Sequence, residues 1–267
     1  MSDTPAPPIA RADLIEGMAK GLAVLESFDT ERQRLNATLA AQRAGLSRAA
    51  ARRHLLTLAH LGYLETDGSY FWLSPRVLRF SGSYLSSARL PRVLQPTLNR
   101  LAQQTRASFS AVVLDADEVV IVANGGQGFD LAPAAATRLL AYGLHLGARL
   151  PAHATSTGRV LLAAKSRGEL AAWLKGRVLP RLTAFTTIGI RQLRGVLEQV
   201  RADDVCLASE EHELGVHAVA VGLRNMQGQT VAALNVVLPG ACGDRERSLR
   251  QWLAPLQQAA RELRPLL

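Results

Sequence analysis

The chain has 267 residues, is 48% hydrophobic, carries a formal net charge of +9 and contains two cysteines. This length favours two domains, the hydrophobic content excludes disorder, and two cysteines are too few for a disulfide framework. No apolar run approaches the roughly 18 residues that span a bilayer, so we expect a cytoplasmic protein with no membrane partner.

Arginine supplies most of the positive charge, because only three of the 31 basic residues are lysine. Arginine pairs with phosphate and guanine through two parallel hydrogen bonds. Genomic base composition explains the same bias equally well, and the basic excess extends into residues 81–267. Net charge therefore does not locate a site.

The Pro/Ala-rich start, residues 1–13, is predicted to be a disordered arm without the apolar core of a signal peptide. A first helix is expected over residues 14–28. Its apolar residues recur at helical spacing, so we expect them to form one buried face: Leu14, Met18, Leu22 and Leu25.

A window from Arg32 to Leu64 holds six arginines and no acidic residue. Asn36 can cap a helix over 37–44, Gly45 can make a turn, and Ser47 can cap a second helix that ends before Gly62. This order predicts a helix-turn-helix, in which the second helix enters the major groove of DNA.

The second helix of this pair has two different faces. Its apolar residues are expected to point inward: Ala51, Leu55, Leu58 and Leu61. The opposite face is predicted to contact DNA through Ser47, Arg48, Ala49, Arg52 and Arg53, with Arg48 nearest the base edges. For Arg53, an ion pair with the first helix or packing against it is the alternative.

A β-hairpin is expected to follow as the wing. The segments 63–66 and 69–73 are β-prone and flank Asp67-Gly68, which favours a two-residue turn. Ser74-Pro75 then predicts the start of a connector helix that ends near Ala88. The expected domains are a winged helix-turn-helix over 14–77, a connector helix over 78–90 and a second domain over 91–267.

The second domain alternates helices and antiparallel hairpins, which predicts an α+β sensor domain with a single sheet. Strands are expected at 109–115, 118–123, 138–143, 205–209, 217–223 and 230–238, with a Gly-rich loop over 124–133. Helices are expected at 92–105, where Pro96 allows a kink, and at 154–165, 169–174, 190–201 and 244–263.

The stretch from Gly147 to Arg159, GARLPAHATSTGR, runs from a proline-stiffened loop into the start of a helix. Unpaired N–H groups and the positive end of the helix dipole favour a carboxylate near Ser156 and Thr157. A capped helix without a ligand is an equally good interpretation of the same residues.

Enzymatic alternatives find little support. His153 and Ser156 have no recognisable acid to orient them, and the histidines lack a metal-ligand spacing. Cys206 lies in an apolar strand, which is typical of a buried inert thiol. We therefore expect no catalytic residue, metal or cofactor.

Residues 210–213, EEHE, are predicted to be a solvated turn. Alternatively, they place an acid near a pocket mouth, which disfavours an anionic ligand.

The segments AGLSRAAARRHLLTLAHLGYLETDG, LPAHATSTGRVLLA and ASEEHELGVHAVAV occur in the order found in IclR-type bacterial transcription regulators, and the chain resembles that family over residues 15–265. YLSSARLPRVLQP and ARRHLLTL are most similar to the branch that regulates aromatic-acid catabolism. The resemblance implies a C-terminal effector domain similar to the GAF fold. For that branch it also implies effectors such as protocatechuate, 4-hydroxybenzoate or β-ketoadipate.

The resemblance also implies partners and pocket residues. Partners would be a pseudopalindromic double-stranded DNA operator and further copies of the chain, as a homodimer or tetramer. The effector pocket would use Ser156 and Thr157, with Ala208, Ala218, Asn235 and Val237 lining the rest. Relatives that bind small keto acids have polar groups at several of these positions, so the apolar residues here favour a ring or a longer chain.

The expected function is transcription regulation by an organic acid that changes operator occupancy or contacts with RNA polymerase. Two alternatives stay open: a hydrolase or acyl-transfer enzyme with an appended DNA-binding domain, and a DNA-binding protein without a ligand.

Overall fold

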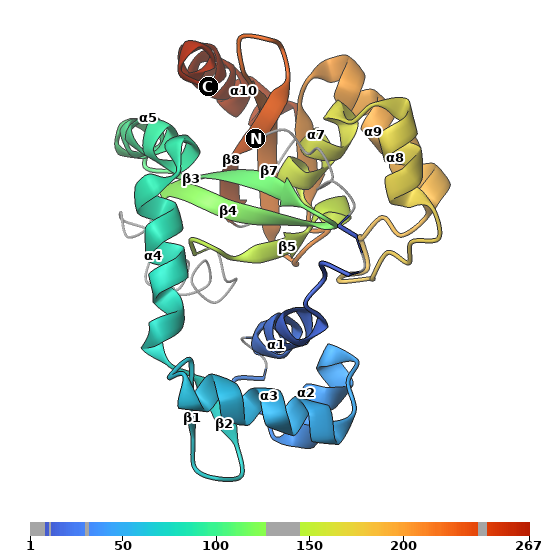
Figure 1. Cartoon of the computed structure of the whole chain (residues 1–267). Helices are drawn as coiled ribbons and strands as arrows, with labels where there is room; N and C mark the ends of the chain where they lie inside the picture. Colours follow the sequence, from blue (N-terminus) through green and yellow to red (C-terminus); the bar gives the residue numbers. More distant parts are fainter. Residues whose placement is uncertain (1–8, 11, 30–31, 127–144, 240–244) are drawn as a thin grey trace. The chain divides into compact units, whose positions relative to one another are not determined.

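The computed structural model describes residues 9, 10, 12–29, 32–126, 145–239 and 245–267 (Figure 1). The chain divides into two compact units, Ser2–Ser87 and Ala88–Leu267, which are described separately. Most of the predicted N-terminal arm, the predicted strand 138–143 and Cys242 lie outside the described residues.

The first unit contains α1 (Glu16–Glu26), α2 (Ala37–Ala44), α3 (Arg48–His60) and a hairpin of β1 (Leu64–Thr66) and β2 (Phe71–Leu73). Both predicted caps are confirmed. Asn36 accepts hydrogen bonds from the N–H groups of Thr38 and Leu39, and Ser47 accepts one from Ala50. Gly45 adopts the left-handed conformation between α2 and α3 (φ 64°), which glycine adopts at little cost. The helix-turn-helix is thus set by local signals.

The wing has a longer turn than expected. Thr66 pairs with Phe71, so four residues connect the strands and the predicted two-residue Asp67-Gly68 turn is wrong. The reason is the Asp67 carboxylate, which accepts N–H bonds from Ser69 (3.0 Å) and Tyr70 (2.8 Å). These bonds keep the two residues in the loop and out of the ladder.

The predicted inward face of α1 is wrong for three of its four residues, since only Leu25 packs, partly buried, against the core of this unit. Leu14, Met18 and Leu22 are 46%, 63% and 53% exposed, whereas the neighbouring Val24 and Phe28 are buried with the core of this unit. In α3, Ala51 and Leu55 are buried and Leu58 is partly buried, as predicted, but Leu61, just after the helix, is exposed. Helical spacing predicts that α1 has an apolar stripe, but it does not predict whether other residues of the chain bury that stripe.

Ser74 caps a 3₁₀ turn over Pro75–Val77. The connector helix α4 (Leu78–Ser87) begins only after this turn, and not at Arg76 as expected. The second unit begins with α5 (Arg89–Thr105), a single helix that contains Pro96. It then forms β3 (Ser108–Asp115) and β4 (Glu118–Gly125), so the strand expected to end at 123 extends into the predicted Gly-rich loop.

A single six-stranded antiparallel sheet organises this unit, in the order β5-β4-β3-β8-β7-β6. Its remaining strands are β5 (Arg149–Pro151), β6 (Cys206–Ser209), β7 (Val216–Arg224) and β8 (Thr230–Pro239). The sequence pattern missed β5 because the strand has only three residues. The β7–β8 turn falls at Asn225–Gly228 as expected, with Gly228 at φ 79°.

Helices cover both faces of the sheet (Figure 1). On one face, α5 and α10 (Arg245–Leu263) pack against Phe109, Val219 and Leu234. On the other, α7 (Ser156–Ala164), α8 (Arg167–Leu174) and α9 (Ile190–Asp203) pack against Val112, Ala220 and other strand residues. This is the expected α+β sensor architecture, with a separate apolar core on each face.

Candidate nucleic-acid interface and ligand site

The predicted DNA-contacting residues form an exposed surface on α3. Ser47, Arg48, Ala49, Arg52 and Arg53 are all exposed, and the residues at i and i+4 lie on the same side of the helix. No carboxylate in the described part of the chain forms an ion pair with these three arginines, so the alternative of an Arg53 ion pair finds no support. Their guanidinium groups face solvent as a DNA-binding helix requires.

Two other arginines of the acid-free window have structural partners. Arg43 pairs with Asp29 and donates to the backbone oxygen of Ser27. Arg34 pairs with Asp67 at 2.9 Å and lies 4.4 Å from the centre of the Trp72 ring, so it braces the wing. The sequence did not reveal this bracing, because both partners lie more than 30 residues along the chain.

In the second unit, the candidate ligand site is at the start of α7. The preceding residues Ala152–Ala154 form a 3₁₀ turn, so the helix begins at Ser156 and not at Ala154 as predicted. Thr155 is the cap, and its side chain accepts the N–H of Gly158 at 3.1 Å. The N–H groups of Ser156 and Thr157 occupy the first two helical positions, which have no acceptor within the helix.

Ser156 also has a buried polar atom without a partner. The residue is 2% exposed, and its Oγ forms no hydrogen bond with any described residue. A buried hydroxyl of this kind costs about 1–3 kcal/mol unless something satisfies it. The start of α7 therefore has donors that the described protein leaves unused.

Gly158 explains how this helix start is held. A Cβ at that position would lie 2.2 Å from the backbone oxygen of Ala152, which is a severe overlap. Only glycine lets the first turn of α7 pack directly on the preceding 3₁₀ turn. Glycine at position 158 is thus required by packing.

The other predicted pocket residues share one face of the sheet. Ala208, Ala218 and Val237 are directly opposite one another in register across β6, β7 and β8. In the adjacent row, Asn235 is opposite Ala220, which packs in the core on the α7 side. Alternate strand residues point to the same face, so all four predicted residues lie on the face that α7 covers.

A polar partner of Asn235 escaped the sequence analysis. Ser110, opposite Asn235 on β3, donates a hydrogen bond to its Oδ1 at 2.8 Å, and both residues are buried. They lie 125 positions apart in the sequence, so only the pairing of β3 with β8 brings them together. This pair adds a buried polar feature to a surface that Ala208, Ala218 and Val237 make small and apolar.

Arg159 fixes the position of α7 above this face. It is 2% exposed and forms two hydrogen bonds with the carboxylate of Glu211, in the loop after β6. Thr187 donates its N–H to the same carboxylate at 2.9 Å, and Thr186 donates its hydroxyl to the Glu211 backbone oxygen at 2.7 Å. The helix start therefore lies at the end of the sheet that holds Ala208 and Ala218.

This ion pair corrects the prediction of a solvated turn at residues 210–213. The Glu211 side chain is only 12% exposed, and its charge is neutralised by Arg159. The Glu211 carboxylate therefore does not disfavour an anionic ligand, contrary to the alternative prediction for this turn.

Two histidines lie near the same loop. Burial lowers the pKa of His153, although a hydrogen bond with the Pro180 backbone oxygen opposes the shift. Burial also lowers the pKa of His212, and the charge on His153 lowers it further. Because no hydrogen bond joins His153 to Ser156 in the described structure, the nucleophile–base contact of the enzymatic alternative is not formed.

Other functional chemistry finds no support among the described residues. Cys206 is buried, and no group of three or more His, Cys, Asp or Glu side chains is placed to hold a metal ion. No helix in the described part of the chain combines the length and hydropathy that crossing a bilayer requires.

Comparisons with known proteins give consistent results. A family model described as "IclR helix-turn-helix domain" matches residues 17–68, and one described as "Bacterial transcriptional regulator IclR C-terminal" matches residues 82–264. The chain is 50% identical over 261 residues to the p-hydroxybenzoate hydroxylase transcriptional activator of Acinetobacter baylyi, covering 97% of this chain and 94% of that protein. It is 47% identical over 259 residues to the Pca operon regulatory protein of the same organism, covering 97% and 91%.

A solved structure similar to the second unit contains a ligand. It is the inducer-binding domain of a double mutant of the PobR transcription factor from Acinetobacter, in complex with 3-hydroxybenzoic acid. It is 43% identical, has a TM-score of 0.59, and covers 66% of this chain and 98% of that one.

Proposed function

The chain belongs to the IclR family of bacterial transcriptional regulators, and we propose that it responds to a hydroxylated aromatic acid bound at the start of α7. It is a DNA-binding regulator controlled by a small organic acid in its C-terminal domain. The observation that carries the proposal is the buried Ser156 hydroxyl without a partner, next to two open helix N–H groups.

These donors suit a carboxylate. Its two oxygens accept hydrogen bonds, so one group can satisfy the Ser156 hydroxyl together with the N–H groups of Ser156 and Thr157. The positive end of the helix dipole adds about 0.3–1 kcal/mol, and more where the geometry is buried. Since Glu211 is already neutralised by Arg159, this carboxylate does not oppose the anion.

The sheet opposite suits an aromatic ring with a hydroxyl group. Ala208, Ala218 and Val237 offer small apolar contacts, and the Ser110–Asn235 pair can exchange hydrogen bonds with a phenol. The comparisons support this class, since a relative activates p-hydroxybenzoate hydroxylase transcription and a PobR inducer-binding domain was solved with 3-hydroxybenzoic acid. We therefore place the carboxylate at α7 and the ring over these strands.

On the DNA side, we propose that Arg48, Arg52 and Arg53 contact an operator, with Ser47 and Ala49 beside them. The unpaired state of these arginines supports the assignment, because cations without protein partners can replace the counterions of DNA. The protein would therefore act in the cytoplasm, where bacterial operators are.

We further propose a homodimer through the first unit, with assembly to a tetramer as a second step. The support is the apolar surface of α1, where Ile15, Met18 and Leu22 are more than half exposed, and that of α4, where Leu78 and Phe80 are 65% and 60% exposed. Soluble monomers rarely leave such surfaces open. Two copies would present two recognition helices to the halves of a pseudopalindromic site.

Ligand control then follows from linkage. The acid shifts the protein toward the arrangement of recognition helices that it binds more tightly, by no more than its difference in affinity between the arrangements. The result is a change in operator occupancy or in contacts with RNA polymerase.

A thermal-shift panel tests the ligand assignment. We expect 3- and 4-hydroxybenzoate to raise the melting temperature. Muconates and keto acids are tested in the same panel as alternative ligands. A ligand at 100 times its Kd stabilises by about 2.7 kcal/mol. The neutral analogue 4-hydroxybenzamide has nearly the same shape without the charge, so it should give little shift.

Ser156→Pro should abolish that shift without unfolding α7. Proline is tolerated at the first helical position, and the preceding Thr155 is already extended (φ −117°, ψ 147°), as a residue before proline must be. The change removes one N–H and one hydroxyl from the site. Arg167→Pro, at the first position of α8, is the matched control and should keep the response.

Three results would contradict parts of this proposal. An undiminished shift in Ser156→Pro would place the anion elsewhere. Absence of a shift with every acid would favour regulation without a ligand, and conversion of an added acid or ester to product would favour the enzymatic alternative.

A further inference from the structure

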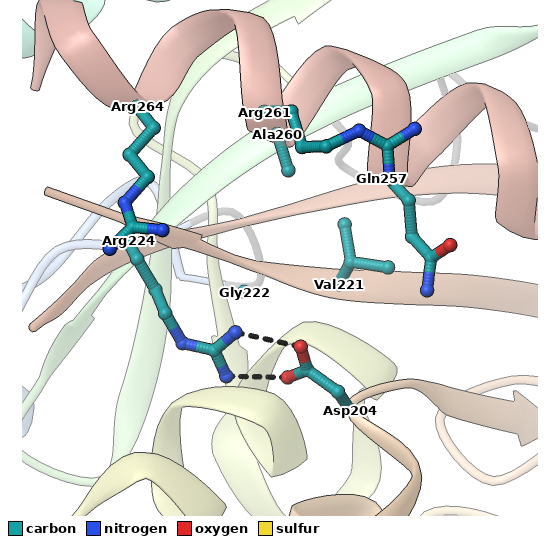
Figure 2. Close-up of a pocket in the computed structure, with 8 residues that line it drawn as sticks. All are labelled: Asp204, Val221, Gly222, Arg224, Gln257, Ala260, Arg261 and Arg264. Atoms are coloured by element: carbon teal, nitrogen blue, oxygen red, sulfur yellow. Dashed lines mark hydrogen bonds and ion pairs between the residues drawn. The ribbon is translucent and has the colours of Figure 1, made fainter. Parts of the chain in front are cut away.

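A hollow lies at the edge of the sheet, between β7 and α10, with a volume of about 200 Å³ (Figure 2). It forms because β6 begins only at Cys206, opposite Ala220, so no strand among the described residues pairs with the outer side of β7 from Val221 to Arg224. The chain arrives there from the end of α9, through Asp204 in the left-handed conformation. The hollow is thus a fixed consequence of where the edge strand starts.

Positive charge dominates this hollow. Arg224 on β7, Arg261 on α10 and Arg264 just after it lie along its walls, and Asp204 is the single acidic residue among the residues that line it. Arg224 makes two hydrogen bonds with Asp204, at 2.7 and 2.5 Å. Neither Arg261 nor Arg264 forms an ion pair in the described part of the chain. The lining has a net charge of +2: three arginines minus one aspartate.

Neutral groups hold the two unpaired arginines. Arg264 donates from Nε to the Asn225 backbone oxygen at 3.3 Å, and Arg261 donates from Nη2 to Gln258 Oε1 at 2.8 Å. Each guanidinium has five N–H donors, so most remain available for another acceptor. Figure 2 shows Arg264 with Arg224 toward one end and Arg261 with Gln257 toward the other, and Val221 between them.

We propose that this hollow binds a small anion through a carboxylate or phosphate group. Planar guanidinium groups bind both oxyanions through paired hydrogen bonds, and Gln257 adds a neutral donor. The volume is below the roughly 300–1,000 Å³ of pockets for drug-sized ligands, which restricts the occupant to a small metabolite.

This site is independent of the one at α7. Val221 belongs to the core that α10 covers, whereas the adjacent Ala220 belongs to the core that α7 covers. The inner wall of the hollow is therefore on the opposite face of the sheet from Ser156. Loss of one site should leave the other intact, so the two proposals can fail separately.

Calorimetric titration of the full chain with succinate and with inorganic phosphate tests the proposal. Saturable binding of succinate alone would identify a carboxylate ligand, and binding of phosphate alone would identify a phosphate ligand. The double variant Arg261→Gln/Arg264→Gln should bind at least about tenfold more weakly, because two charge-assisted hydrogen-bond donors are lost. Its hydroxybenzoate response should be unchanged.

Two further variants make the result specific. Arg191→Gln/Arg194→Gln removes the same number of exposed arginines at the far end of α9 and should bind as the unmodified protein does. Asp204→Asn should bind more tightly, because it releases Arg224 and asparagine tolerates the left-handed conformation. Absence of saturable binding of either anion would overturn the proposal. The proposal would also be overturned if Arg191→Gln/Arg194→Gln weakened anion binding as much as Arg261→Gln/Arg264→Gln does, or if Asp204→Asn left the affinity for the anion unchanged.

Discussion

The two units place arginine in opposite settings. On α3, Arg48, Arg52 and Arg53 are exposed and have no acidic partner in the described chain. In the second unit, Arg159 is buried and bound to the Glu211 carboxylate by two hydrogen bonds. A DNA-binding surface needs charges that are free to meet phosphate. At the start of α7 the charge of Arg159 is instead used up by Glu211, so hydrogen-bond donors of the helix start are left to bind a ligand there.

This difference predicts which property each arginine controls. An exposed arginine without partners contributes little to stability, usually within about 0.5 kcal/mol. A buried arginine that neutralises a carboxylate is part of the fold, since removing it leaves an unpaired charge. Substitutions in the two units should therefore separate DNA affinity from stability.

The largest expected effect is on the stability of the second unit. Arg159→Ala should lower its free energy of unfolding by about 3–5 kcal/mol, because Glu211 is left buried without its partner. The measurement is urea unfolding followed by fluorescence of Trp173 and Trp252. Arg159→Met/Glu211→Met removes both charges and should cost clearly less. If Arg159→Ala unfolds like the unmodified protein, the pair does not hold α7 in place.

Disruption of the proposed dimer should give the next largest effect, on operator affinity. Met18→Asp/Leu22→Asp places charges on the exposed apolar surface of α1, so it should yield monomers in sedimentation velocity. Loss of simultaneous binding to two half-sites should weaken operator binding by about 10²-fold or more. Val178→Asp, at an apolar residue that is 88% exposed, is the control. A dimer that persists in Met18→Asp/Leu22→Asp would place the interface elsewhere.

Arg52→Ala tests the recognition surface itself. Loss of one base or phosphate contact should weaken operator binding by about 1–3 kcal/mol per half-site, with the melting temperature unchanged. Fluorescence anisotropy at several salt concentrations should also give a shallower dependence of affinity on salt. Arg191→Ala, at an exposed arginine in the second unit, should change neither. Operator binding as tight as that of the unmodified protein would refute the assignment of Arg52.

The helix-turn-helix and the exposed face of α3 could be predicted because their signals are local. Asn36 and Ser47 cap helices through N–H groups two or three residues away, and four-residue spacing sets the face of α3. The exposed stripe of α1 was misjudged for a related reason. Helical spacing shows that Met18 and Leu22 share a face, but a stripe that packs within the chain and one left for a second copy have the same sequence pattern.

The structure of the candidate ligand site could be predicted only in part, because the residues that pair with one another there are distant in sequence. The small and hydroxyl residues around Ser156 identified the helix start, and the family resemblance supplied Ala208, Ala218, Asn235 and Val237. No local pattern pairs Ser110 with Asn235 or Arg159 with Glu211, which lie 125 and 52 positions apart. The solvated turn predicted at 210–213 was wrong for the same reason.

The smallest predicted effect is a pH dependence of the stability of the second unit. His153 and His212 have pKa values lowered mainly by burial, so the folded protein takes up protons less readily than the unfolded chain does. As pH falls below about 6.5, the ordinary pKa of histidine, the unfolded state binds more protons and stability decreases. Urea unfolding followed by tryptophan fluorescence should therefore give a lower free energy at pH 5.5 than at pH 7.5. Burial raises the pKa of Glu213, which acts in the opposite direction but mainly at lower pH. His153→Gln/His212→Gln should flatten the dependence, and an equally steep dependence in that variant would assign it to other groups.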